Sequence, residues 1–349
     1  EMQKSAIEAG GDVSSINERL SEELVKLEGL DAADVAVPDP TAPPPAPAPE
    51  VDFSGYDLSE RDFAGLDLHG CKFEGSILRR TNFCGADLTG ASFFGSVLSA
   101  TQLQGATCAG ADFRMSYLPK TDFRGAVLHG ADFAQANMVK ADFSNADMTG
   151  AKAATLVANK CSFAGAKLEA VEFNKLHFDN CNFDQANFRG AKLPSTMFRE
   201  CSMVEARFDS ADVTKGAFLS CDLTRAVFYA AIGDTTNFKD SKLHATDFRY
   251  AQMPSNIFMG VDATGARFAA SNMPLCRFYR AVLRDTDFDQ ANLFGADVRK
   301  ASLSDARFTR ANLYRAAFVE AFGTGADFRK ANLELTNFMR NELVAKGLS

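Results

Sequence analysis

The residues best suited to metal or redox chemistry are four cysteines at a constant spacing of twenty: Cys161, Cys181, Cys201 and Cys221. A zinc site needs its ligands arranged tetrahedrally around one point. In a structure that repeats with this same spacing, these thiols would instead form a straight column of parallel side chains, a geometry that suits disulfides poorly. We therefore expect reduced cysteines that act as small core residues, and we predict no metal site.

The histidines and aspartates do not form a catalytic group. His69, His129 and His244 each follow a large apolar residue and His177 precedes one, so all four are expected on the surface. The frequent aspartates recur with the sequence repeat, which indicates outward residues near turns and not general acids. The sequence contains no phosphate-binding loop, metalloprotease motif or dinucleotide-binding motif. We therefore predict no catalytic residue and no cofactor, and we do not expect an enzyme.

A period of five residues organises most of the chain. From Phe53 to Leu343 we call every residue whose number ends in 3 or 8 a centre; of these 59 centres, 28 are Phe and 18 are Leu. Two places before the centre, 49 of the 59 positions hold Ala, Cys, Ser, Thr or Gly. Alternate residues of a flat strand share a face, so large residues five apart can share one interior only if the chain turns a corner between them.

Glycine and proline mark these corners. Of the 25 glycines, 18 lie two places after a centre, where a tight turn favours a residue that tolerates positive φ. Pro119, Pro194, Pro254 and Pro274 each lie one place after a centre, which fits the edge of a turn better than a paired strand. Each five-residue unit is therefore predicted to form one side of a coil, with its centre and its small residue pointing inward.

This pattern resembles the pentapeptide-repeat family, whose motif is a small residue, Asp or Asn, Leu or Phe, and two variable positions. Examples are "ADF" at 111–113 and "ANL" at 311–313, and the resemblance extends from residue 51 to about 343. It implies an all-β fold, a right-handed four-sided parallel β-helix (a solenoid) with four repeats per coil. The 59 repeats would then make about 14–15 coils. A filled core of this kind leaves no internal pocket for a substrate.

Some parts of the repeat are predicted to deviate. Phe occupies centres ending in 3 up to residue 173 and later prefers centres ending in 8, so we expect a swelling, bend or change of twist near 173–188. In residues 151–160 both centres are alanines, and this stretch is predicted to be a distorted coil or protruding loop. Leu156 would replace part of the lost volume, and Phe322 would do the same beside Gly323.

The segment before the repeats has a different composition. Residues 1–37 are predicted to contain a short amphipathic helix over 15–28, which starts with a capping box from Ser15 to Glu18 and is followed by Gly29. Its apolar stripe must pack on the following domain or on a partner. The stripe consists of Ile16, Leu20, Leu24 and Leu27.

The remaining boundaries follow from composition. Residues 38–50 include seven prolines and are predicted to be a semi-rigid linker. The repeat domain follows at 51–343, and residues 344–349 are expected to cap its last layer, with Leu343, Val344 and Leu348 covering the core. Because the chain begins with Glu and not Met, we expect it to be the C-terminal part of a larger protein.

Charge separates two possible roles of the surface. Residues 1–50 hold 11 acidic and 3 basic residues, which leaves 34 of each sign in the rest of the chain. The resemblance implies that the protein could bind type II topoisomerases as a DNA mimic, as some family members do, but mimicry requires a dense anionic surface. The candidate partner-facing residues are two acidic columns, Asp112 with Asp132 and Asp122 with Asp142, and a basic column, Arg280, Lys300 and Arg340, which Glu320 interrupts.

The sequence therefore predicts a non-enzymatic rigid rod that acts as a protein-interaction platform or spacer. The resemblance implies a bacterial protein, with secretion-system accessory factors among the family members that carry such rods. We expect an unknown protein partner, no direct nucleic-acid binding, a monomer, and a cytoplasmic location, because no apolar run is long enough to span a membrane and no signal peptide is evident. The alternative is a DNA mimic that binds or protects DNA gyrase.

Overall fold

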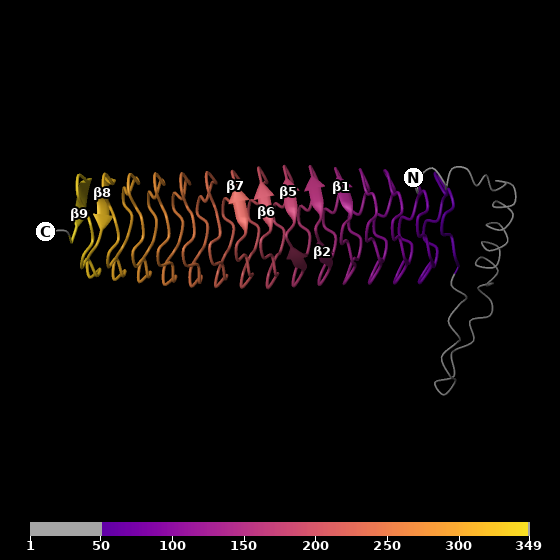
Figure 1. Ribbon diagram of the computed structural model, residues 1–349, viewed down its shortest axis with the longest axis horizontal. Helices are drawn as coiled ribbons and strands as arrows, with labels where there is room; N and C mark the ends of the chain where they lie inside the picture. Colours follow the sequence, from indigo (N-terminus) through magenta and orange to yellow (C-terminus); the bar gives the residue numbers. More distant parts are fainter. Residues whose placement is uncertain (1–50, 348–349) are drawn as a thin grey trace, which may run out of the picture.

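The computed structural model describes residues 51–347, and these form an all-β solenoid. The coils stack along a nearly straight axis, with residue 51 at one end and the last strand, β9, at the other (Figure 1). The predicted helix at 15–28 and the linker at 38–50 lie outside the described residues. Within the described part of the chain, no helix is long and apolar enough to cross a membrane.

The coils pair in parallel, and each residue pairs with the one twenty positions later. Along one ladder Asp52 pairs with Lys72, which in turn pairs with Ser92, and three further ladders start at residues 57, 62 and 67. Backbone hydrogen bonds join the coils; the N–H of Phe53, for example, donates to the carbonyl oxygen of Lys72 at 2.7 Å. The four ladders give each coil four sides, and the predicted all-β solenoid is confirmed.

On most sides of the coils only one residue pairs with the next coil. In the described residues nine segments pair over three or more residues and so form strands, all of them parallel. Two of them end the solenoid as a pair, β8 (Phe322–Asp327) and β9 (Glu342–Lys346). The other seven cluster in the middle of the rod, where β1, β3, β5, β6 and β7 form one sheet and β2 pairs with β4. These seven are β1 (Asn137–Val139), β2 (Lys152–Ala154), β3 (Val157–Asn159), β4 (Glu172–Asn174), β5 (His177–Asp179), β6 (Met197–Arg199) and β7 (Ala217–Leu219).

The corners use the left-handed backbone conformation. Two places after each centre from Phe53 to Phe338 φ is positive whether or not the residue is glycine, as at Gly75 (62°), Lys120 (57°) and Lys140 (58°). A type II turn requires positive φ at its third residue and favours proline at its second. Pro119, directly before Lys120, occupies that second position. The predicted corners are therefore confirmed.

The Phe centres fill the core as stacked columns. Rings one coil apart are nearly parallel; those of Phe208 and Phe228, for example, have centroids 4.6 Å apart and planes at 6°. Rings from different columns meet edge to face, as Phe218 and Phe228 do at 5.7 Å and 87°. Both arrangements suit the quadrupole of an aromatic ring. All 28 Phe centres are buried except Phe338, which lies near the C-terminal end of the rod.

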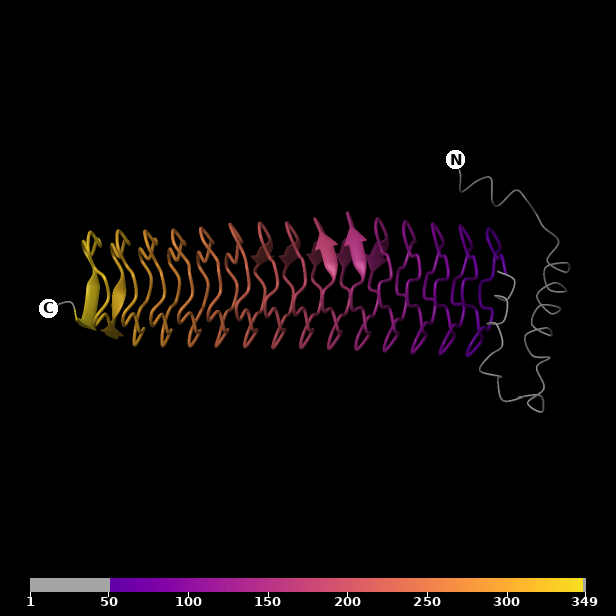
Figure 2. The same ribbon diagram turned by 90° about the horizontal axis from the view of Figure 1, so that it is seen from below.

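The stacks change columns in the middle of the rod, as predicted. The stack through Phe143, Phe163 and Phe183 overlaps a new stack that begins with Phe178 and Phe198. Neither view of the rod shows a bend at this point (Figures 1 and 2). The three-residue strands β1–β7 also lie in this middle part of the rod.

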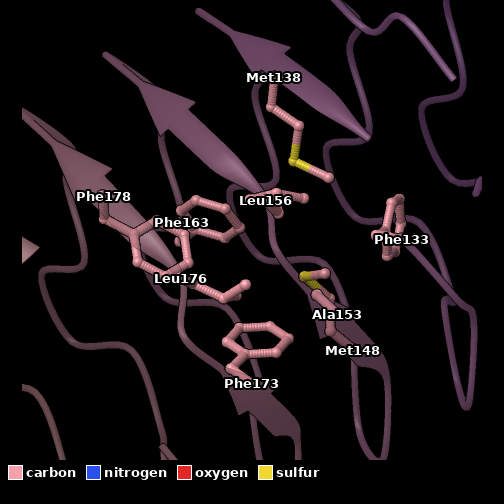
Figure 3. A pocket seen from close by; sticks show the side chains of 9 residues that line it. All are labelled: Phe133, Met138, Met148, Ala153, Leu156, Phe163, Phe173, Leu176 and Phe178. Atoms are coloured by element: carbon pink, nitrogen blue, oxygen red, sulfur yellow. The ribbon is translucent and has the colours of Figure 1, made fainter. Parts of the chain in front are cut away.

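Of the two alternatives predicted for residues 151–160, the protruding loop is wrong. This stretch keeps the register of the coils, because Lys152 pairs with Asp132 on one side and with Glu172 on the other. The small centres are accommodated inside the rod, where a cavity of about 10 Å³ remains (Figure 3). Its lining is wholly apolar: Phe133, Met138, Met148, Ala153, Leu156, Phe163, Phe173, Leu176 and Phe178. Leu156 is buried and fills part of the lost volume, as predicted.

Two predictions near the C-terminal end are wrong. Phe322 does not compensate for Gly323, because its side chain points outward and is 47% exposed. Val344 is 69% exposed and does not cover the core, whereas Leu343 is partly buried against it. Leu348, the third residue expected in this cap, lies outside the described residues. Strand β9 pairs with β8, so the described part of the expected cap at 344–349 begins as a continuation of the solenoid.

Candidate interaction surfaces

The column of cysteines lies inside the rod. Cys161, Cys181, Cys201 and Cys221 are buried and unbridged. Each Sγ lies 3.4–3.7 Å from the backbone carbonyl oxygen of the residue 23 positions earlier. The hydroxyl of Thr121, which occupies the same column, donates to the equivalent oxygen, that of Leu98. No group of three or more His, Cys, Asp or Glu residues between 51 and 347 could hold a metal ion. These cysteines are therefore small core residues with weak hydrogen bonds to the backbone.

The histidines lie on the surface. Three of them approach an aspartate: His69 Nδ1 lies 2.7 Å from Asp67, His129 Nε2 lies 3.0 Å from Asp147, and His244 Nε2 lies 2.9 Å from Asp262. The fourth, His177, is exposed in β5. The three paired histidines belong to separate coils, so they do not converge on one site.

The recurrent aspartates cap the corners. Oδ1 of Asp52 accepts the backbone N–H of Ser54 at 2.9 Å, and Asp212 accepts the N–H of Thr214 in the same way. An Asp side chain that binds the backbone two residues later stabilises a turn. This contact explains why Asp or Asn precedes so many centres, and it leaves these carboxylates with a structural role.

Several capping aspartates also bind an arginine two residues later. At Asp327 the side chain of Arg329 donates two hydrogen bonds, with Nη2 2.6 Å from Oδ2. This side-chain hydrogen bond holds the pKa of Asp327 down, at about 2. The same arrangement recurs at Asp112–Arg114, Asp122–Arg124, Asp247–Arg249 and Asp297–Arg299. Each pair neutralises its own carboxylate on the surface.

The predicted acidic columns exist but are partly neutralised. Asp112 pairs with Asp132, and Asp122 with Asp142, across neighbouring coils. Asp112 and Asp122 are two of the aspartates that bind the arginine two residues later. Arg124 also lies 3.9 Å from Asp142. The columns therefore alternate with guanidinium groups and do not form a continuous anionic surface.

Two residues of the predicted basic column lie near one aromatic ring. The guanidinium of Arg280 lies 5.3 Å from the centroid of the Tyr279 ring, and Nζ of Lys300 lies 5.9 Å from it. Lys300 also forms an ion pair with Glu320 at 3.4 Å. Arg340 lies beyond this glutamate, so the structure brings together only Arg280 and Lys300 of the three.

A cationic groove that the sequence analysis missed lies on the same corner of the rod, near the N-terminal end. It has a volume of about 560 Å³ and is lined by Ser59, Glu60, Arg79, Arg80, Ser99, Ala100, Pro119 and Lys120. Arg80 binds Glu60 at 2.9 Å. Arg79 and Lys120 form no ion pair with another residue between 51 and 347, so the groove retains a net positive charge.

An apolar strip borders this groove. Ile77, Val97 and Tyr117 pair in three successive coils on the side that leads into the groove. At the preceding corner Met115 is 55% exposed and Phe94 is 38% exposed, while Tyr117 itself is 46% exposed. We call these five residues together with the groove the amphipathic face. A comparison of positions twenty apart would have found it, because Ile, Val and Tyr here replace the usual outward Asp or Asn.

Comparison with protein-family models gives two matches. The model described as "Pentapeptide repeats (8 copies)" matches residues 62–99, 91–130, 116–152, 264–299 and 301–340, and the model described as "Pentapeptide repeat region" matches residues 157–228. Together they cover about two thirds of the chain. None of the curated proteins compared with the chain gave a significant match.

Several solved structures are similar to the chain. HetL, a pentapeptide repeat protein involved in heterocyst differentiation regulation from the cyanobacterium Nostoc sp. strain PCC 7120, is 18% identical, with 83% of this chain and 90% of HetL covered and a TM-score of 0.33. A pentapeptide repeat protein from the Arabidopsis thaliana thylakoid lumen is 40% identical over 29% of this chain and 66% of its own, with a TM-score of 0.24.

QnrB1, a plasmid-mediated fluoroquinolone resistance protein, is 17% identical; 61% of this chain and 91% of QnrB1 are covered, and the TM-score is 0.31. These structural scores are low, so the assignment depends on the family matches and on the repeat itself. The period of five, the register of the coils and the two family models agree along the described rod. The chain therefore belongs to the pentapeptide-repeat family.

Proposed function

We propose that this chain is a non-catalytic, rigid rod that binds a protein partner through the amphipathic face and holds it at a fixed distance from other parts of the assembly. For the rod itself we propose a right-handed solenoid of 14–15 coils over residues 51–343. The twenty-residue register of the ladders supports this count. At a spacing of about 4.8 Å between paired strands, such a rod is about 70 Å long.

The observation that carries this proposal is a group of exposed apolar side chains, Phe94, Met115 and Tyr117, beside the cationic groove. Ile77 and Val97, in the same strip as Tyr117, are partly exposed. Residues at the same outward position elsewhere are mostly polar; on another side of the same coils the equivalent residues are Asp67, Asp87 and Thr107. Contiguous exposed apolar surface on a protein commonly marks an interaction site. Aromatic residues, Met and Arg are also the types enriched in the centres of protein interfaces.

The chemistry of the face indicates the kind of partner. Tyr117 and Met115 offer apolar contact area, while Arg79 and Lys120 offer charges that no described carboxylate neutralises. The partner that fits best is a protein segment with an apolar stripe and acidic side chains along one edge. The acidic groups would determine orientation and the association rate, and the apolar contacts would supply most of the affinity.

A photo-crosslinking experiment tests this surface. A photoreactive phenylalanine analogue replaces Tyr117 in the full chain within the organism that produces it, and in a control chain it replaces Ile232, which is 51% exposed on a different coil. We expect one defined protein adduct from position 117 and not from position 232. In a chain with the analogue at position 117, Met115→Asp should abolish the adduct. Equal adducts from both positions, or an adduct that persists with Met115→Asp, would rule out this face as the binding site.

DNA mimicry is the second candidate function, and the acidic columns at Asp112–Asp132 and Asp122–Asp142 favour it. The arginines beside Asp112 and Asp122 reduce the anionic field that a DNA-binding surface would recognise. A gyrase supercoiling assay with added protein separates the two functions. The platform proposal expects no effect at micromolar protein, whereas inhibition or protection that disappears with Asp132→Asn and Asp142→Asn would favour mimicry.

The remaining features of the assembly are part of the same proposal. We propose a monomeric rod, because a platform of this kind needs no second copy. We also propose a cytoplasmic location, which the eight unbridged cysteines support, since free thiols persist in reducing compartments.

A further inference from the structure

The two ends of the rod differ in how their core is covered. In the last coils the inward side chains of Leu333, Phe338 and Leu343 are only partly buried, as expected where no further coil follows. In the first coil the inward side chains remain at most 7% exposed, although no described coil precedes them. These side chains are Phe53, Leu58, Phe63 and Leu68.

The first coil also breaks the rule of small residues. Only ten of the 59 positions two places before a centre hold a residue other than Ala, Cys, Ser, Thr or Gly, and four of the ten are the first four: Val51, Tyr56, Arg61 and Leu66. Small residues are needed there in an inner coil because the coils on both sides leave little space. Larger residues fit at the end of the described rod, where one of the two neighbouring coils is absent and another kind of segment can take its place.

The larger residues cover only part of the end. Val51, Tyr56 and Leu66 pack against the core and are themselves partly buried. An apolar layer at the end of a solenoid requires a cap with a polar outer face, because the stacking interaction is otherwise unsatisfied there. The first coil therefore has the composition and the burial of a surface that another segment covers.

We propose that residues 15–28 of this same chain form that cap, with the apolar stripe of Ile16, Leu20, Leu24 and Leu27 packed on the first coil. The length of the intervening chain supports this occupant. Residues 29–50 join the segment directly to Val51, and 22 residues in extended polyproline conformation span up to about 68 Å, far more than the width of one coil. The opposite side of the segment carries Glu18 and Glu22, which supply the polar outer face.

Hydrogen exchange of backbone amides in the full chain tests the proposal. The N–H groups of Phe53 and Leu58 donate to the second coil at 2.7 and 2.8 Å, so their exchange reports opening of the first coil. Leu24→Asp places a charge in the apolar stripe, and the matched control Val25→Asp places the same charge on the opposite side of the segment. We expect exchange at Phe53 and Leu58 to become about tenfold faster or more in Leu24→Asp. Exchange should be unchanged in Val25→Asp, and at Phe228 in both variants.

Crosslinking identifies the occupant independently of stability. A photoreactive residue at position 24 should attach within the same molecule to residues between 51 and 68, and the attachment site can be read by peptide mapping. Equal exchange in the two variants would overturn the proposal. So would an adduct between two molecules, because a second copy would then be the cap.

Discussion

The ring of Phe163 meets the ring of Phe178 edge to face, with centroids 5.8 Å apart and planes at 90°. Phe163 belongs to a stack that comes from the N-terminal half of the rod, and Phe178 begins a stack that continues toward the C-terminus. This contact joins the two halves of the aromatic core. Both residues also line the small cavity left by Ala153 (Figure 3).

Truncation of a stacked Phe should cost far more stability than truncation of an exposed one. Phe178 is 1% exposed and Phe322 is 47% exposed. We expect Phe178→Ala to lower the free energy of unfolding by about 3–5 kcal/mol, because it removes buried area and leaves a void. Phe322→Ala should change it by about 0.5 kcal/mol or less. Urea unfolding followed by circular dichroism measures both, and similar losses would contradict the inward and outward positions.

Filling the cavity should stabilise the rod. Ala153→Val adds two methyl groups at the cavity wall, and we expect a gain of about 0.5–1 kcal/mol in the free energy of unfolding. As a matched control, Ala306→Val adds the same groups beside the closely stacked rings of Phe288 and Phe308 (4.9 Å). Overpacking should cost about 1–3 kcal/mol there. Thermal unfolding distinguishes the two variants, and a loss in Ala153→Val would show that the space is not available.

The buried thiols should resist alkylation in the folded protein. Burial raises the pKa of the Cys276 thiol to about 12, so very little thiolate is present at neutral pH. Cys84 is only partly buried and should react first with iodoacetamide. Mass spectrometry of labelled peptides gives the order of reaction, and all eight cysteines should react in denaturant. Labelling of Cys181 or Cys201 as fast as Cys84 in the native protein would contradict the buried column.

The Asp–Arg pairs should make stability depend on pH in the acidic range. The pKa of Asp327 is lowered from 3.8 to about 2, first by its hydrogen bond with Arg329. A carboxylate with a lowered folded-state pKa stabilises the fold above its unfolded pKa, and this stabilisation is lost as the pH falls from about 4 to about 2. Arg329→Gln should therefore cost up to about 1 kcal/mol at pH 7 and almost nothing near pH 2.

Arg315 provides the control for this experiment, since it packs on the ring of Tyr314 and forms no ion pair with another residue between 51 and 347. Arg315→Gln should show no such difference between pH 7 and pH 2. Unfolding curves at a series of pH values test both variants. A constant difference between wild type and Arg329→Gln over this range would mean that the pair does not stabilise the fold.

The sequence by itself determined the interior of the rod. Large residues such as Phe123 and Leu313 recur every five positions, and this period is compatible with one common interior only if the chain turns after each repeat. The glycines and the four prolines of the repeats fixed the location of the turns, because each suits one particular backbone conformation. The cysteine column and the capping aspartates could be predicted for the same reason, since each repeats with the coil.

Only the tertiary structure decided how neighbouring coils fill space and which outward residues meet. From the sequence, the small residue Ala153 was compatible with either an internal void or a protruding loop. The structure has the void, because a loop would break the backbone hydrogen bonds between neighbouring coils. Phe322 could not be placed from its volume alone. The amphipathic face consists of residues such as Phe94, Tyr117 and Lys120, which lie on different sides and coils and become neighbours only when the solenoid stacks.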